Sequence, residues 1–167
     1  MGVWTVGVDF DTKAVYACAV HPHHPPVWAQ ASLVSKLASG NAASLAAVPT
    51  AMASIRDQLA TGIGVEGRIP ADAWFERGRG MSRKGDWILG AVCGALMCTW
   101  PRVGTGAPRL LETADWKKQM GAPGNSAKAI ANAATALHLR HAWPLALVPT
   151  DHNQLDAYAI ATTGALR

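Results

Sequence analysis

Cysteine is scarce in this sequence, which has only Cys18, Cys93 and Cys98 among 167 residues. An odd number of cysteines without a Cys-x-x-Cys spacing argues against a disulfide framework and against a cysteine-based zinc site. Reduced, buried thiols are the expected state, and they are typical of cytoplasmic proteins.

Long hydrophobic runs and signal features are also missing. The most apolar stretch, residues 87–100, is shorter than the roughly 20 residues that a membrane-spanning helix needs. The first residues lack the basic segment and long apolar stretch of a secretory signal. We therefore expect a cytoplasmic protein. Its Ala, Gly and Trp content favours a bacterial or phage-infected bacterial cell.

Charged residues make up only 16% of the chain, whereas half of the residues are apolar. The chain can therefore build a hydrophobic core, and its length fits one domain over residues 1–167. Basic residues outnumber acidic ones by 15 to 11, which gives a formal net charge of +4. This modest excess is compatible with a nucleic-acid partner, but many ordinary proteins share it.

Apolar runs and turn residues predict a succession of strands and helices. Strands are expected at 4–8, 15–20, 27–34, 63–65 and 109–112, with 143–148 as an optional sixth. Helices are expected at 41–59, with a break or kink at Pro49, and at 86–97, 114–120, 127–141 and 151–165. This order indicates an α/β fold with a mixed sheet.

Residues 67–85 mix basic residues with glycines and are predicted to form an exposed, mobile basic segment. Its basic residues are Arg68, Arg77, Arg79, Arg83 and Lys84. They either bind phosphates or form an ordinary solvated surface. Trp74 and Phe75 lie in the same segment, where they either stack on a nucleic-acid base or pack back onto the domain.

Three carboxylates lie at the end of, or inside, apolar elements. Asp9 follows the first predicted strand, Glu66 follows the strand at 63–65, and Asp156 lies in the apolar last helix. Such carboxylates repel one another unless a divalent cation neutralises them, and a pair of cations can hydrolyse a phosphodiester. The alternatives are a turn at Asp9, an ion pair between Glu66 and Arg68, and solvent exposure of Asp156.

The start of the last helix adds further candidates. Asp151 is either the helix N-cap or a metal ligand. His152 lies four residues before Asp156, so both occupy one helical face. Asn153 also faces that way. His152 either binds metal or positions water, or it is a surface histidine without a role.

These residues stand in segments that resemble the RuvC-like Holliday junction resolvases over nearly the whole chain. The similar segments are VGVDFDTKAVYACAV, GVEGRIP, RKGDWILGAVCGALM, ADWKKQMGAPGNSAKAIA and HNQLDAYAIA. The resemblance implies a ribonuclease H-like fold, in which helices cover both faces of a mixed five-stranded sheet. It also implies that Asp9, Glu66 and Asp156 hold Mg²⁺ or Mn²⁺ in a two-metal site.

The resemblance is imperfect at the fourth metal ligand, because Asn153 stands where the family often has Asp or His. Asp151 or His152 takes this role by a shift of register. The resemblance further implies a homodimer that resolves four-way DNA junctions in recombination and repair, cutting to leave a 5′-phosphate. Lys117, Lys118 and Lys128 are expected to join the basic segment in binding phosphates.

Two other functions remain open from the sequence, and a third is excluded by the length of the chain. A ribonuclease H-like or YqgF-like nuclease would act on RNA or on an RNA–DNA hybrid. A noncatalytic module would bind DNA junctions without cutting them. The VGVDFDTK segment also resembles the phosphate loop of actin-like and sugar-kinase ATPases, but those proteins need two such domains, and 167 residues are too few.

Overall fold

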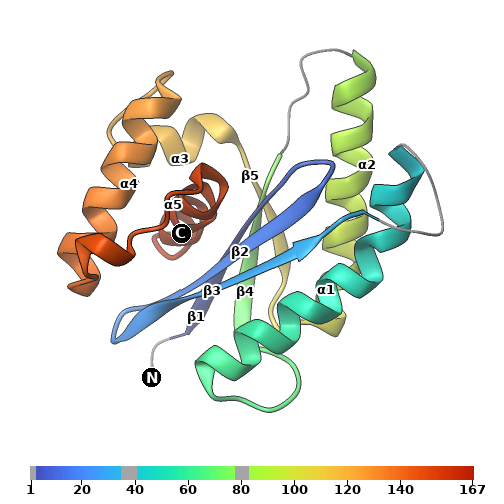
Figure 1. Ribbon diagram of the computed structural model, residues 1–167, viewed down its shortest axis with the longest axis horizontal. Helices are drawn as coiled ribbons and strands as arrows, with labels where there is room; N and C mark the ends of the chain where they lie inside the picture. Colours follow the sequence, from blue (N-terminus) through green and yellow to red (C-terminus); the bar gives the residue numbers. More distant parts are fainter. Residues whose placement is uncertain (1–2, 35–40, 78–82) are drawn as a thin grey trace.

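The structure is a computed structural model that describes residues 3–34, 41–77 and 83–167. Its centre is a five-stranded sheet of order β3-β2-β1-β4-β5 (Figure 1). The strands are β1 (Trp4–Phe10), β2 (Ala14–His21), β3 (His24–Ser32), β4 (Ala71–Glu76) and β5 (Pro108–Leu111). The first three strands are antiparallel, whereas β4 and β5 run parallel to β1. The predicted mixed five-stranded sheet is thus confirmed.

Helices cover both faces of this sheet (Figure 1). The helices α1 (Asn41–Ile63) and α2 (Arg83–Thr99) lie on one face, and α3 (Thr113–Gln119), α4 (Ser126–His141) and α5 (His152–Gly164) lie on the other. Short 3-10 turns occur at Trp100–Arg102 and Leu145–Leu147. Within the described ranges, no helix has the length and apolar character needed to cross a membrane.

The alternation of β1 divides its residues between the two cores. Val6, Val8 and Phe10 belong to the core beneath α1 and α2. The residues between them therefore face α5, because successive side chains of a strand point to opposite faces. At Gly7 a Cβ atom would collide with the backbone of α5 at Ala157 and Ala161. Glycine at this position lets the backbone of α5 lie directly on β1.

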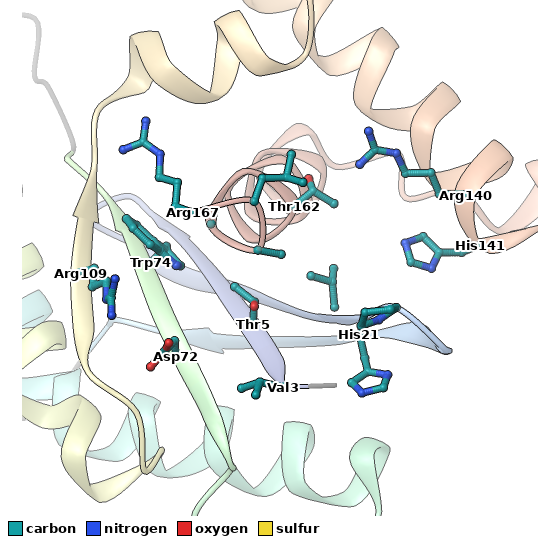
Figure 2. A pocket seen from close by; sticks show the side chains of 15 residues that line it. Val3, Thr5, His21, Asp72, Trp74, Arg109, Arg140, His141, Thr162 and Arg167 are labelled. Atoms are coloured by element: carbon teal, nitrogen blue, oxygen red, sulfur yellow. The ribbon is translucent and has the colours of Figure 1, made fainter. Parts of the chain in front are cut away.

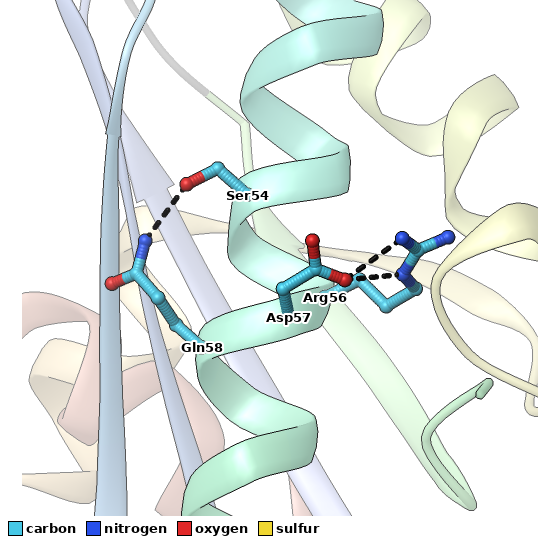
Figure 3. A network of polar contacts seen from close by, with 4 residues as sticks. All are labelled: Ser54, Arg56, Asp57 and Gln58. Carbon is cyan, nitrogen blue, oxygen red and sulfur yellow. Dashed lines mark hydrogen bonds and ion pairs between the residues drawn. The ribbon is translucent and has the colours of Figure 1, made fainter. Parts of the chain in front are cut away.

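Helix α1 is fastened to the edge strand β3 by one glutamine. The side-chain oxygen of Gln58 accepts a hydrogen bond from the Gln30 backbone N–H at 3.1 Å, and its amide group donates to the Gln30 carbonyl at 2.9 Å. The same amide donates to Ser54 Oγ, one turn earlier in α1 (Figure 3). These contacts use the free backbone groups of an edge strand, which otherwise invite pairing with another chain.

The predicted break of α1 at Pro49 is wrong, because one helix runs through it from Asn41 to Ile63. The neighbouring residues Val48, Met52 and Ile55 are buried in the core beneath this helix. Their burial offsets the backbone hydrogen bond that proline cannot donate.

Two predicted strands are also wrong. Residues 63–65 are the end of α1, where Gly64 takes a left-handed φ of 78° and the backbone N–H groups of Gly64 and Val65 both reach the Ala60 carbonyl. Glycine adopts this conformation without steric cost, so it ends the helix here. Residues 143–148 contain the 3-10 turn at Leu145–Leu147 rather than a strand.

Candidate metal centre

Asp9 and Glu76 lie side by side at the carboxyl ends of two adjacent parallel strands. The register pairs Val8 of β1 with Phe75 of β4, so the next residue of each strand is one of the two carboxylates. Phe75 is in the core beneath α1 and α2, which directs Glu76 to the opposite face together with Asp9. Asp9 is only 8% exposed and Glu76 only 9%, so two carboxyl groups are buried together.

Asp156 joins this pair from the first turns of α5. The helix reaches the site because Gly7 lets α5 pack against β1, and its neighbours Leu155 and Ala157 are buried in the core. Asp156 is partly buried, and among the described residues no group donates a hydrogen bond to its buried Oδ1 atom. A buried carboxylate oxygen without a partner is costly, and a cation would relieve that cost.

The pKa values of these carboxyl groups report their mutual proximity. Burial raises the pKa of Asp9 well above its ordinary value, and the negative charges of Glu76 and Asp156 raise it further. Burial and the charge of Glu76 also raise the pKa of Asp156 to about 7. The charges of His152 and Lys117 oppose this shift. The site therefore disfavours three free negative charges, which is the electrostatic condition for binding a divalent cation.

Helix α3 contributes a buried hydrogen-bond donor and a positive charge. The indole N–H of Trp116 donates to Glu76 Oε1 at 3.1 Å, and Trp116 is almost fully buried. Lys117 lines an open cavity of about 540 Å³ together with Asp9, Glu76 and Glu112. Its ammonium group donates to Ser126 Oγ at 2.6 Å. The cavity thus combines carboxylates, which can hold a cation, with a lysine, which can bind a phosphate group directly.

The donor set fits a magnesium or manganese ion. Asp9, Glu76 and Asp156 offer carboxylate oxygens, the ligands that such hard cations prefer. With the side chains as they lie, no group of three His, Cys, Asp or Glu residues in the described part of the chain forms a ready-made cation site. Burial and the neighbouring Glu76 carboxyl group raise the pKa of Asp9, so the metal-free site favours a proton on Asp9. A cation bound by these carboxylates would take the place of this proton.

The start of α5 holds the candidates for a fourth ligand. Asp151 is the N-cap, and its Oδ1 accepts a hydrogen bond from the Asn153 backbone N–H at 2.9 Å. The charge of Asp151 still reaches Asp156, whose pKa it raises. His152 is exposed. Burial raises the pKa of the Tyr16 hydroxyl, and the nearby Asn153 side chain opposes this shift. Metal binding by Asp151 and His152 stays a prediction.

The structure does not bring Glu66 to this site, so its predicted role with Asp9 is wrong. Glu66 is exposed in the connection between α1 and β4. The first residue of β4, Ala71, pairs with Trp4 at the start of β1, whereas Asp9 lies near the end of that strand. Glu66 is thus at the other end of the sheet, and Glu76 stands where it was expected.

Glu76 was missed because β4 lies inside the segment that was predicted to be a mobile basic loop. The signal was the alternation in ADAWFE, where Ala71, Ala73 and Phe75 face one core and Glu76 ends the strand. Of the two alternatives for the aromatic pair, packing onto the domain is confirmed and stacking on a base is wrong. Phe75 is fully buried, and Trp74 is only 7% exposed. Neither ring is free to stack on a nucleic-acid base.

The predicted phosphate-binding residues are dispersed around the molecule. Lys118 and Lys128 are exposed on α3 and α4. Arg68 is exposed and donates to the Pro101 carbonyl at 3.3 Å, away from the acidic site. Arg77 is exposed next to Glu76 and forms a 3.4 Å ion pair with Glu112.

The side chains of the other predicted basic residues lie outside the part of the chain that the structure describes. Arg79 lies outside the described residues. Arg83 and Lys84 belong to the first turn of α2, and their side chains are likewise outside the description.

Two solved structures share this architecture. A structure of Thermus thermophilus RuvC in complex with a Holliday junction substrate matches with a TM-score of 0.66 and 11% sequence identity, covering 98% of this chain and 92% of that chain. A second Thermus thermophilus RuvC structure matches with a TM-score of 0.62 and 15% identity, covering 97% of this chain and 93% of that one. Neither a family model nor a curated protein sequence matches this chain.

The chain therefore has a RuvC-like fold of the ribonuclease H-like type. This confirms the fold that the sequence segments predicted. At 11% and 15% identity the similarity establishes the fold alone. Any function must be argued from the residues of the site.

Proposed function

We propose that this chain is a metal-dependent endonuclease that resolves four-way DNA junctions in recombination and repair. The observation that carries the proposal is the meeting of three carboxylates, Asp9, Glu76 and Asp156, at one end of a RuvC-like sheet. Asp9 and Glu76 are also among the few buried charged residues of the described chain. Buried charges are rare unless they are paired or hold a metal.

Each residue of the site has a distinct part in this chemistry. Asp9, Glu76 and Asp156 would hold Mg²⁺ or Mn²⁺, which would supply an activated water and stabilise the negative charge of phosphodiester hydrolysis. Trp116 keeps the carboxylate of Glu76 in one orientation. Lys117 places a positive charge in the same cavity, where it attracts the substrate phosphate. Lys118 and Lys128 contribute affinity for neighbouring phosphates, which is independent of base sequence.

The experiment compares labelled substrates that differ only in structure: a four-way junction, a flap, a linear duplex and an RNA–DNA hybrid. We expect Mg²⁺ or Mn²⁺ to support cleavage of the junction, and EDTA to abolish it. Asp9→Asn should bind the junction without cutting it. Preferred cutting of the hybrid would favour the ribonuclease H-like alternative. Junction binding without any cutting by the wild-type chain would favour a noncatalytic module.

Resolution of a junction requires two cuts in opposed strands, and therefore two active sites related by symmetry. Helix α2 offers a face for a second copy of the chain: Trp87 is 71% exposed, and a Cβ atom added at the nearby Gly90 would meet nothing within 4 Å. Aromatic residues such as tryptophan are enriched at protein–protein interfaces. Trp87→Glu should give a folded monomer in light scattering, whereas the wild type should be a dimer. A wild-type monomer at working concentration would contradict the homodimer.

A further inference from the structure

A second cavity, of about 530 Å³, lies on the same side of the sheet as α5 (Figure 2). It is near the C-terminal end of α5, whereas the metal centre is near its N-terminal end. We propose that this cavity binds a small organic anion, with a phosphate or carboxylate group attached to an apolar body. The metal centre and the RuvC-like similarity do not account for it.

The cavity is separate from the acidic site. It is lined by Thr162 and Gly164 at the end of α5, whereas Asp156 lies in the first turns of that helix. The helical rise between Asp156 and Thr162 is about 9 Å. The strands agree, because Thr5 and Asp72 line the cavity near the starts of β1 and β4, and the carboxylates of the metal centre lie near the ends of the same strands.

Positive charge predominates in the lining. Arg109 lies on β5, Arg140 lies on α4 and Arg167 follows α5, whereas Asp72 is the one acidic side chain among the described lining residues. One oxygen of Asp72 is occupied, because it accepts the Ala107 backbone N–H at 3.2 Å. Arg167 is also neutralised, by a 3.0 Å ion pair with Asp115. With Arg167 paired, Arg109 and Arg140 outnumber the one negative side chain, Asp72.

These two arginines lie on opposite sides of the cavity. Figure 2 shows Arg109 beside Trp74 on one side and Arg140 beside His141 on the other, with Thr5 between them. The guanidinium of Arg109 is held 5.4 Å from the centre of the Trp74 ring. No ion pair in the described part of the chain involves either arginine. Free guanidinium groups recognise carboxylate and phosphate oxygens in paired hydrogen bonds.

Part of the remaining lining is apolar, and this part decides the second property of the ligand. Val3, Val20, Ala165 and Leu166 form the apolar part of the wall. A cavity of a few hundred cubic ångströms, lined by apolar groups with a few convergent polar ones, is typical of small-molecule sites. A free inorganic anion would leave the apolar wall uncovered, and a neutral molecule would leave the arginines unused. The chemistry therefore favours an anion with an apolar body over extended nucleic acid.

The experiment titrates the protein with phenyl phosphate, and with phenol and inorganic phosphate as probes that carry only the ring or only the charge. Isothermal titration gives the affinities, and the NMR signal of the Trp74 indole N–H reports the location. We expect phenyl phosphate to bind at least about tenfold more tightly than either control probe. It should also shift the Trp74 signal. The Arg109→Ala/Arg140→Ala double variant should lose at least about tenfold of this affinity.

Two controls separate this site from the rest of the molecule. Arg56→Ala removes an arginine on α1, across the sheet, and should leave phenyl phosphate binding unchanged. Asp9→Asn should also leave it unchanged, so the inference stands or falls independently of the nuclease proposal. Equal binding by the double variant, or no difference among the three probes, would overturn the inference. It would likewise be overturned if duplex DNA displaced phenyl phosphate and the double variant lost DNA affinity in parallel.

Discussion

The indole nitrogen of Trp116 lies 3.1 Å from Glu76 Oε1, to which its N–H donates a hydrogen bond. Both residues are buried, at 1% and 9% exposure, so little water is available to replace this bond. The donor comes from the helix after β5, and the acceptor is the last residue of β4. The contact holds Oε1 of Glu76 in place and leaves Oε2 available to bind a metal ion. Trp116 thus acts as a positioning residue.

Trp116→Phe should weaken Mn²⁺ binding by about 10- to 100-fold, because the residues that orient metal ligands typically have effects of this size. Trp100→Phe is the matched control, since Trp100 is equally buried and its indole N–H donates to the Gly106 carbonyl at 2.9 Å. Both variants should lose about 1–3 kcal/mol of unfolding free energy. Calorimetric Mn²⁺ titration and thermal melts measure the two effects. Equal Mn²⁺ affinity in both variants would show that Trp116 has only a structural role.

Glu76→Gln should reduce metal-dependent cleavage by about 100-fold or more, since several kcal/mol of charge stabilisation depend on the metal ligands. Glu66→Gln should leave cleavage unchanged, because Glu66 is exposed and lies toward the other end of the sheet. The two substitutions make the same chemical change, so single-turnover rates on one junction compare them directly. A large loss of cleavage in Glu66→Gln, with normal cleavage in Glu76→Gln, would contradict a metal centre that contains Glu76.

The metal-free protein should become less stable as the pH rises from about 4 to 8. The unfolded chain ionises its Asp carboxyls near about 3.9, whereas the folded pKa of Asp156 is about 7 and that of Asp9 is also raised. Between these values the folded state holds protons that the unfolded state has released, so stability falls with rising pH.

Thermal melts in EDTA at several pH values test this dependence. Asp156→Asn should flatten the pH profile, because its amide does not ionise in this range. Excess Mn²⁺ should restore stability at pH 8, since a ligand that binds only the folded state stabilises it. If the stability of Asp156→Asn falls with pH as steeply as that of the wild type, groups other than Asp156 cause the pH dependence.

Gly7→Ala should destabilise the fold by about 3 kcal/mol or more, because its methyl group would collide with the backbone of α5 and not with a flexible side chain. The displacement would also move Asp156 and weaken Mn²⁺ binding. Gly94→Ala is the control, since a Cβ atom there meets nothing within 4 Å. Alanine in the interior of α2 should raise the unfolding free energy by up to about 1 kcal/mol relative to glycine. Urea unfolding of both variants measures the difference. Equal stabilities would argue against close packing of α5 on β1.

Asp9 and Asp156 can be identified from the sequence, because each is an acidic residue in or directly after an apolar run. This pattern involves only neighbouring residues. Glu76 is hidden from such an analysis, since its six-residue strand is followed closely by arginines and glycines. Its partner is chosen by parallel pairing with β1, more than sixty residues earlier in the chain. Glu66 was selected instead because Ile63 and Val65 look like a strand, although they end a helix.

Contacts between distant segments were equally inaccessible from the sequence. Trp116 and Glu76 are separated by 40 residues, and no periodicity connects them. The cavity at the end of α5 gathers Arg109, Arg140 and Arg167, none of which the sequence singles out. The continuity of α1 through Pro49 likewise depends on tertiary burial, which outweighs local propensity.

The most direct measurement is a crystal structure of the Mn²⁺-soaked protein, with anomalous diffraction to locate the metal. We predict an anomalous peak within about 2.5 Å of carboxylate oxygens of Asp9, Glu76 and Asp156. A fully occupied Mn²⁺ elsewhere, or no peak between these residues at millimolar Mn²⁺, would contradict the metal centre and with it the proposed nuclease.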